Sequence, residues 1–335
     1  MDTAMPVVVT GGLTDPAVLE VVLGVAAVGQ AGRVGDIDAV LLRGLSPQAM
    51  ARLTHYGLAL GLLVEADVLV MTSGGTIHAK GWLDVSPVDW QAREVALAVM
   101  GLQDKLPVEQ IRARLGEIRV AVASRVRAAN ATLRGLRVGA GEVVEDAKRV
   151  LHAGFFSVEE SRLRFRRFDG RMSEPVRREV FVSGDAVTVL PYDPVRDRVL
   201  VVEQMRMGPY GRGDPLPWQL EVIAGRIDPG ETPEDCARRE ALEEAGLTLG
   251  PLEKVAEFYS SPGAMTEYLY SYVALCDLPD GAAGVFGLAA EVEDIRGHLV
   301  AFDALMALVA GGEVSNAPLI LTALWLQRER GRLRG

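Results

Sequence analysis

The pattern of hydrophobic and polar positions changes character near Phe155. Before it, short apolar runs such as Val7–Thr10 are followed by segments with helical spacing. After it, Phe156–Phe168 alternates arginine with apolar residues, which is typical of a half-exposed strand. The predicted strands are Val7–Thr10, Ala39–Leu42, Val68–Met71, Phe156–Phe168, Arg177–Val182, Val187–Pro191, Val199–Gln204, Lys254–Tyr259 and Tyr268–Asp277. The predicted helices are Asp15–Leu23, Pro87–Met100, Val108–Leu133, Pro233–Ala245, Leu305–Ala310 and Pro318–Arg328.

A glycine-rich stretch, Gly135–Gly141, is the best candidate for a domain boundary. We therefore predict one domain over residues 1–140 and a second over 145–335. The second mixes strands and helices over a length that suits a compact α/β sandwich with a mixed sheet. The first is expected to be a smaller α+β domain built around a barrel-like sheet.

The segment from Thr232 to Gly246 carries the strongest local signal. Thr232 suits an N-cap, the next residue is a proline at the first helical position, and Gly246 suits a C-cap. On the helix between them, Glu240, Glu243 and Glu244 share one face. Like charges at that spacing repel, but a hard cation such as Mg²⁺ or Mn²⁺ reverses the effect and bridges carboxylates to phosphates.

Arg239 stands beside these glutamates, and its planar guanidinium can orient a carboxylate. The alternative interpretation is a solvated Glu/Arg helix face. It is disfavoured because Gly225, Gly230 and Glu231 lie at fixed distances before the helix. A metal held there would polarise a phosphoryl oxygen and lower the pKa of an attacking water.

Composition narrows the classes of function. The chain of 335 residues has 35 basic and 45 acidic residues, net charge −10, which argues against nucleic-acid binding. Its two cysteines, Cys236 and Cys276, indicate a reducing cytoplasm and neither a disulfide framework nor a zinc site. The first residues have no basic region typical of a signal peptide, and no apolar stretch is long enough to cross a membrane.

The stretch GRIDPGETPEDCARREALEEAGL (225–247) resembles the Nudix box, the signature of metal-dependent hydrolases of nucleoside diphosphates linked to another group. Further pieces resemble the ADP-ribose pyrophosphatase subgroup of that family, and the likeness covers roughly 150–330. One of them is the Ser261-Pro262-Gly263 turn, with Pro262 15 residues after Leu247. The others are GFFSVEESRLRFRRFDGRMSEPVRREVF (154–181), VVEQMRMGPY (201–210), PWQLEVIAGRIDPGE (217–231), GLAAEVEDIRGHLV (287–300) and SNAPLILTALWLQRER (315–330).

This resemblance implies metal ligands. Glu240 and Glu244 correspond to the main ligands, helped by the backbone carbonyl of Ala224. Glu243 corresponds to a further ligand, and Glu293 to an additional one. Two or three Mg²⁺ ions, or Mn²⁺ ions, are implied in each site.

The resemblance also implies a base and substrate contacts. Glu291 corresponds to the general base that activates water. The reverse assignment, with Glu293 as the base and Glu291 as the metal ligand, is the alternative. Taken alone, their acidic loop would be interpreted as a solvated turn. The implied substrate residues are Arg178, Arg206, Phe155, which would stack on adenine, and the turn Ser261, Pro262 and Gly263.

The implied reaction converts ADP-ribose and water to AMP and ribose 5-phosphate. Family members dimerise by exchanging the N-terminal strands of this domain, so a homodimer is expected. The Arg-rich run Arg162–Arg178 is expected to recruit anions or to form the dimer interface rather than to bind nucleic acid. The alternatives are a Nudix hydrolase of another nucleoside diphosphate sugar, such as GDP-mannose, and a regulator that senses ADP-ribose without cleaving it. The intact glutamates disfavour the regulator.

The N-terminal part resembles gamma-glutamylcyclotransferase-like domains. Thr10-Gly11-Gly12-Leu13 stands where that family has Tyr-Gly-Ser/Thr-Leu, so the tyrosine is missing. The catalytic glutamate of that family falls at Gly57, which has no side chain. A non-catalytic, structural or dimerisation domain is therefore expected. The combination of the two domains resembles proteins associated with tellurite resistance in proteobacteria.

Overall fold

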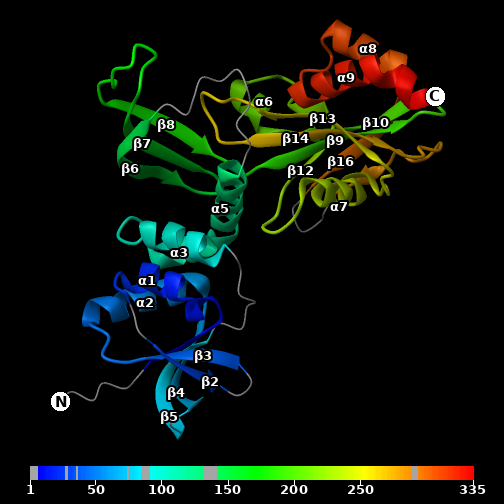
Figure 1. Cartoon of the computed structure of the whole chain (residues 1–335). Helices are drawn as coiled ribbons and strands as arrows, with labels where there is room; N and C mark the ends of the chain where they lie inside the picture. Colours follow the sequence, from blue (N-terminus) through cyan, green and yellow to red (C-terminus); the bar gives the residue numbers. More distant parts are fainter. Residues whose placement is uncertain are drawn as a thin grey trace. The chain divides into compact units, whose positions relative to one another are not determined.

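The computed structural model of the chain describes residues 7–26, 29–34, 37–73, 75–83, 91–130, 142–287 and 293–335. The chain forms two compact units, residues 1–177 and 178–335, which we call the N-terminal and C-terminal units. Figure 1 shows that each unit combines strands with helices, so the predicted fold class is confirmed. The domain limits of 140 and 145 remain a prediction. Among the described helices, none is both long and apolar enough for a membrane span.

Five strands of the N-terminal unit form a closed barrel in the order β1-β3-β2-β4-β5. Its apolar first strand is buried on both faces: Val8 lies among the barrel residues, whereas Val7 and Val9 pack with the helices. β1 pairs antiparallel with β3 and parallel with β5, which closes the barrel. The five strands are β1 (Val7–Thr10), β2 (Gln30–Val34), β3 (Ile37–Leu42), β4 (Leu63–Thr72) and β5 (Gly75–Leu83).

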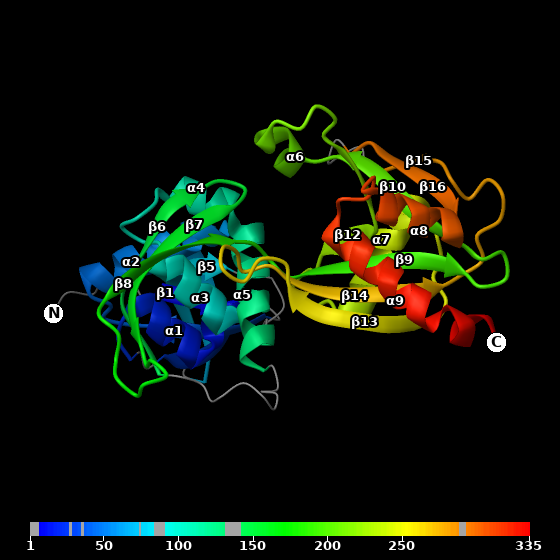
Figure 2. The ribbon, with the colours of Figure 1, turned by 90° about the horizontal axis from the view of Figure 1, so that it is seen from above.

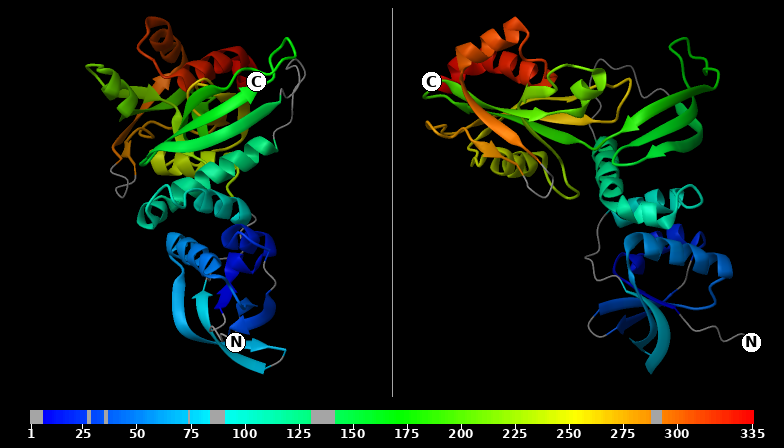
Figure 3. Two further views of the ribbon diagram at one scale, coloured as in Figure 1. Left: turned by 90° about the vertical axis from the view of Figure 1, so that its left-hand side faces the viewer. Right: turned by 180° about the vertical axis from the view of Figure 1, so that it is seen from behind.

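The helices of this unit pack together beside the barrel, and Figure 3 shows α1 and α2 next to the strands. Asp15 and Ser46 cap α1 and α2 with their side chains. The sequence predicts one helix over Val108–Leu133, which is wrong: Arg114 leaves the helical conformation at φ −110° and ψ 15°, and its Nε donates to the Gly154 carbonyl at 2.6 Å. The helices are η1 (Gly11–Thr14), α1 (Pro16–Leu23), α2 (Pro47–Leu60), α3 (Ala92–Gly101), α4 (Val108–Ala113) and α5 (Leu115–Ala129).

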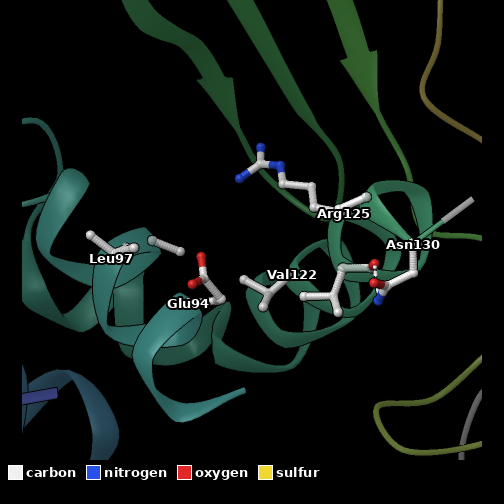
Figure 4. Close-up of a pocket in the computed structure, with 8 residues that line it drawn as sticks. Glu94, Leu97, Val122, Arg125 and Asn130 are labelled. Carbon is white, nitrogen blue, oxygen red and sulfur yellow. Dashed lines mark hydrogen bonds between the residues drawn. The ribbon is translucent and has the colours of Figure 1, made fainter. Parts of the chain in front are cut away.

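An open hollow of about 580 Å³ lies between α3 and α5 (Figure 4). Its charged side chains are already engaged, because Arg125 pairs with Glu159 at 3.2 Å and Glu94 pairs with Arg93 at 2.8 Å. We assign it no function.

A separate three-stranded sheet follows, in the order β6-β7-β8. β6 (Val143–Ala153) and β7 (Ser157–Phe165) form an antiparallel hairpin, and β8 (Val176–Val182) leads into the C-terminal unit. Ion pairs connect the two strands of the hairpin, among them Arg149 with Glu160 at 2.7 Å. Arg149 and Arg164 therefore have carboxylate partners within the sheet.

The C-terminal unit is built on a mixed sheet with the path β13-β14-β9-β10-β16-β15. In Figure 2 the strands β9, β14 and β13 run side by side, and β9 pairs parallel with β14. β11 and β12 pair with β10 and β9 respectively. The strands are β9 (Ala186–Asp193), β10 (Arg198–Met205), β11 (Trp218–Glu221), β12 (Ile223–Arg226), β13 (Leu252–Tyr259), β14 (Tyr268–Leu275), β15 (Val285–Phe286) and β16 (Ile295–Ala301).

Helices cover both faces of this sheet: α7 (Pro233–Ala245) lies on one, and α8 (Phe302–Gly311) and α9 (Ala317–Arg334) on the other (Figure 1). Alternate residues of β9 therefore enter different cores. Val187 and Val189 pack with α7, whereas Leu190 and Tyr192 pack with α8 and α9. Burial on both faces explains why β9 is a continuous apolar run. The short helix α6 (Met207–Arg212) follows β10.

Candidate active site

Helix α7 begins and ends where the sequence predicts. The Thr232 hydroxyl accepts the backbone N–H of Asp235 at 3.1 Å and donates to its carboxylate at 2.7 Å. Gly246 ends the helix at φ +63°, a conformation that glycine adopts without strain. These ends fix the limits of the helix. Its buried residues Cys236, Ala237 and Ala241 pack into the core and fix which face carries the glutamates.

Arg239 is the centre of a carboxylate network. Its Nε and Nη2 donate to the two oxygens of Glu231 at 2.9 and 3.0 Å, a bidentate pair. Its Nη1 donates to Glu240 at 2.6 Å and to Glu243 at 3.1 Å. The bond to Glu231, followed by the charge of Glu240, raises the pKa of Arg239 despite burial. One guanidinium therefore holds three acidic side chains of the motif in fixed positions.

Among the glutamates of this face, Glu244 is the most buried, with 3% of its surface exposed. Its Oε2 accepts the backbone N–H of Ala224 at 3.3 Å. Burial, and then the negative charge of Glu240, raise the pKa of Glu244 to about 8. A carboxylate in such surroundings favours a partner that neutralises it, either a proton or a cation.

Gly225 lies on β12, directly against this face. A Cβ atom at position 225 would lie 1.8 Å from Oε1 and 1.9 Å from the carboxyl carbon of Glu240. The first fixed glycine of the motif is therefore required by the close approach of β12 to Glu240. Ala224 and Gly225 together bring the strand backbone against Glu244 and Glu240.

The oxygen-rich donor set suits a hard divalent cation. Within the described residues, no three Asp, Glu, His or Cys side chains converge on one point. Mg²⁺ fits this arrangement because it is commonly bound by one or two carboxylates and completes its shell with water and substrate phosphates. Glu240 and Glu244 would supply those carboxylates, and the clustered negative charge would be relieved by the ion.

Glu293 lies just before β16, and its charge acts on both Glu240 and Glu244. The structure thus brings Glu293 to the acidic face. Glu291, the predicted base, lies outside the described residues.

Arg206 also lies within the electrostatic reach of this face. Its Nε donates to Oε2 of Glu221 at 2.8 Å, and its Nη2 forms an ion pair with the same oxygen at 2.7 Å. Burial disfavours the charged form, but the bond to Glu221 and the charges of Glu221, Glu244 and Glu293 outweigh it and raise the pKa of Arg206. The sequence alone does not indicate a role for Glu221, because a single glutamate on a short strand belongs to no recognisable spacing pattern.

The remaining predicted substrate residues are on exposed segments. Arg178 is exposed on β8, and the turn of Ser261, Pro262 and Gly263 is also exposed. A residue of that turn, Ala264, accepts the backbone N–H of Phe181 at 2.9 Å, which ties the turn to the end of β8. Phe155 belongs to the N-terminal unit, in the turn between β6 and β7, where 60% of its surface is exposed.

Comparison with known proteins agrees with this geometry. The profile of the NUDIX domain matches residues 182–321. The ADP-ribose pyrophosphatase of Escherichia coli (strain K12) is 42% identical over 196 residues, which are 58% of this chain and 93% of that protein. The ADP-ribose pyrophosphatase of Haemophilus influenzae is 34% identical over 189 residues, 56% of this chain and 87% of that protein.

A third relative, the GDP-mannose pyrophosphatase of Enterobacter sp. (strain 638), is 31% identical over 151 residues, 45% of this chain and 78% of that protein. In all three cases more than three quarters of the relative is matched by part of this chain. The motif at 225–247, the carboxylate face built on it and these similarities lead to one conclusion: the chain belongs to the Nudix family.

Proposed function

We propose that the domain of residues 145–335 hydrolyses the diphosphate of ADP-ribose to AMP and ribose 5-phosphate with the help of divalent metal ions. The observation that carries the proposal is the acidic face of α7, where Arg239 holds Glu231, Glu240 and Glu243 while Glu244 lies buried against Ala224. The 42% identity to a pyrophosphatase of ADP-ribose supports this substrate.

Each residue has a proposed role. Glu240, Glu244 and the carbonyl of Ala224 would hold the metal, with Glu243 and Glu293 as further ligands. The ions, Mg²⁺ or Mn²⁺ and two or three in number, would neutralise the diphosphate and polarise its phosphoryl oxygens.

Glu291 would take the proton from the attacking water, and Glu293 is the alternative base. Arg239 would keep the carboxylates in place. Arg206 and Arg178 would contact the substrate phosphates or adenine, Phe155 would stack on adenine, and the Ser261-Pro262-Gly263 turn would border the substrate.

The second candidate substrate is GDP-mannose, because a GDP-mannose pyrophosphatase is 31% identical over a shorter segment. The higher identity and longer coverage of the ADP-ribose pyrophosphatases favour ADP-ribose. A panel of both compounds with Mg²⁺, monitored by release of phosphate monoesters, separates the two. Binding of ADP-ribose without metal-dependent release would instead favour a sensing regulator.

The same assay tests the proposed metal face. The substitution Glu244→Gln removes a charge but keeps the size of the side chain, so turnover should fall by orders of magnitude while the melting temperature is retained. Glu234→Gln is the matched control, since Glu234 is on the same helix but accepts the hydroxyl of Tyr272 at 3.0 Å. Equal turnover of wild type and Glu244→Gln would refute the assignment.

The setting of this activity is also proposed. We infer a homodimer that exchanges the strands preceding the Nudix domain, in the cytoplasm; a monomeric mass at micromolar concentration would exclude the dimer. Residues 1–140 are proposed as a non-catalytic gamma-glutamylcyclotransferase-like domain, because Gly57 offers no side chain and is buried in α2. The resemblance to proteins associated with tellurite resistance rests on this combination of domains.

A further inference from the structure

Arg206 is held by only one edge of its guanidinium group. Its hydrogen bond from Nε at 2.8 Å and its ion-pair contact from Nη2 at 2.7 Å both end on the same oxygen of Glu221, Oε2. Only 9% of the Glu221 side chain is exposed, whereas 41% of the Arg206 side chain is. Within the part of the chain that the structure describes, Nη1 has no hydrogen-bond partner. The outer edge of the guanidinium is thus available to an anion.

The other oxygen of Glu221 is held by Asn316, the residue that caps helix α9. Nδ2 of Asn316 donates to Oε1 of Glu221 at 3.2 Å, and Oδ1 of Asn316 accepts the backbone N–H of Leu319 at 2.9 Å. This second bond caps α9. Because a carboxylate only accepts and a backbone N–H only donates, the amide can satisfy both partners in one orientation alone.

The resulting chain of contacts runs from the start of α9 through Glu221 to Arg206. A buried carboxylate that bonds a cation on one oxygen and an amide on the other has little freedom to rotate. Arg206 in turn lies in the field of Glu244 and Glu293, the residues of the acidic face. The position of α9 is thereby linked to the direction in which one cation of the site points.

We propose that Asn316 is a positioning residue for substrate binding: through Glu221 it orients Arg206 so that the guanidinium meets the diphosphate of the substrate. The inference rests on the proposed function in so far as it takes a diphosphate as the ligand. It adds two residues, Asn316 and Glu221, that lie outside the motif and touch neither the metal face nor the substrate.

The test uses Asn316→Ser in the full-length chain. Serine is also a good N-cap, so α9 should keep its start while the donor to Glu221 is lost. We expect KM for ADP-ribose to rise about tenfold, because a hydrogen bond to a charged group typically contributes about that factor. The turnover number and the melting temperature should stay near those of the wild type.

Ser315→Ala is the matched control. Ser315 precedes Asn316 and donates to Gln219, a residue of the same strand as Glu221 that does not bond Arg206. The control should leave KM unchanged. Asn316→Asp provides a second variant, since aspartate also caps helices but sets a negative charge against Glu221, and it should raise KM further.

A double-mutant cycle separates positioning from a structural role. In an Arg206→Ala background, Asn316→Ser should raise KM no further. A KM within twofold of the wild type for Asn316→Ser, or an equal rise with and without Arg206, would overturn the proposal.

A binding measurement keeps the test independent of turnover. Calorimetric titration with methylenediphosphonate, an unhydrolysable diphosphate, should show the same tenfold weakening in Asn316→Ser and none in Ser315→Ala. If the wild type fails to hydrolyse ADP-ribose, the proposed function is wrong. The titration still decides whether Asn316 acts on the diphosphate through Arg206. A dissociation constant that is the same in the wild type and in Asn316→Ser would reject the positioning role of Asn316.

Discussion

Gly225 shows how one missing side chain shapes the site. The strand β12 passes so close to α7 that the carboxylate of Glu240 occupies the space of a Cβ at position 225. The requirement is steric, because Gly225 is not among the glycines with a positive φ. The identity of this residue therefore controls where Glu240 lies.

The substitution Gly225→Ala should consequently displace Glu240 and reduce kcat/KM for ADP-ribose at least about 100-fold, the loss expected when a reacting group moves by about 1 Å. Circular dichroism should show the helix content of the wild type. Gly331→Ala is the control, since nothing lies within 4 Å of a Cβ at that position of α9. Wild-type activity in Gly225→Ala would mean that Glu240 does not need its present position.

At the level of single residues, the sequence predicts the members of the acidic face and leaves the partners of Arg206 unmarked. The spacing of Glu240, Glu243 and Glu244 follows from helix geometry alone. Glu221 and Asn316 are 95 residues apart and meet only because β11 and the start of α9 lie together in the folded unit. No local pattern encodes such a contact.

The turn between β9 and β10 depends on one buried carboxylate. Asp193 has 2% of its side chain exposed and accepts the backbone N–H groups of Val195 at 2.9 Å, Arg196 at 3.0 Å and Leu278 at 3.1 Å. Burial alone would raise the pKa of Asp193, but these bonds and the Arg196 side chain outweigh it and lower the pKa to about 2. The charged carboxylate therefore stabilises the folded state.

The sign of this effect predicts a pH dependence. The pKa of Asp193 is lower in the folded than in the unfolded chain, where it is 3.8, so its contribution is present above pH 3.8 and lost as the pH falls towards about 2. Asp193→Asn should lower the free energy of unfolding at pH 7 by about 2 kcal/mol, measured with urea. Below pH 4 the difference in the free energy of unfolding between Asp193→Asn and the wild type should become smaller.

Asp280→Asn serves as the comparison. Asp280 pairs with Arg198, but 96% of its side chain is exposed, so its removal should have little effect at any pH. A difference between wild type and Asp193→Asn that stays constant from pH 7 to pH 3 would contradict the pH prediction.

Some elements with strong periodicity or clear caps were predicted, but length alone did not decide the outcome. The capped helix α2 and the long strand β6 were both missed. The helix at 233–245 and the strand at 7–10 have their predicted limits. β11, β12 and α6 were missed because four to six residues carry too little pattern, although β12 supplies Ala224 and Gly225. The helix predicted over 108–133 is broken at Arg114, where a bond to Gly154 in the β6–β7 turn accompanies the change of conformation.

For the whole molecule, the proposed metal ligands all fall within the C-terminal unit, residues 178–335. We therefore expect a fragment of residues 142–335, which retains β6, β7 and β8, to hydrolyse ADP-ribose with the kcat/KM of the full chain. The fragment must first show a cooperative thermal transition. Loss of turnover in such a folded fragment would assign residues before 142 to the active site.

The parallel pairing of β9 with β14 has a consequence for how the molecule is made. Thr188 on β9 bonds Ser271 on β14, 83 residues later, and the strands β10, β11 and β12 and helix α7 all lie between them in the chain. Contacts of such long sequence separation form slowly, because a large loop must close before the ladder stabilises it. During synthesis, the acidic residues of α7 leave the ribosome before the strand that completes their sheet. The hydrophobic core beneath α7, which includes Tyr272 and Ala274 of β14, is thus completed only late in folding, when β14 docks beside β9.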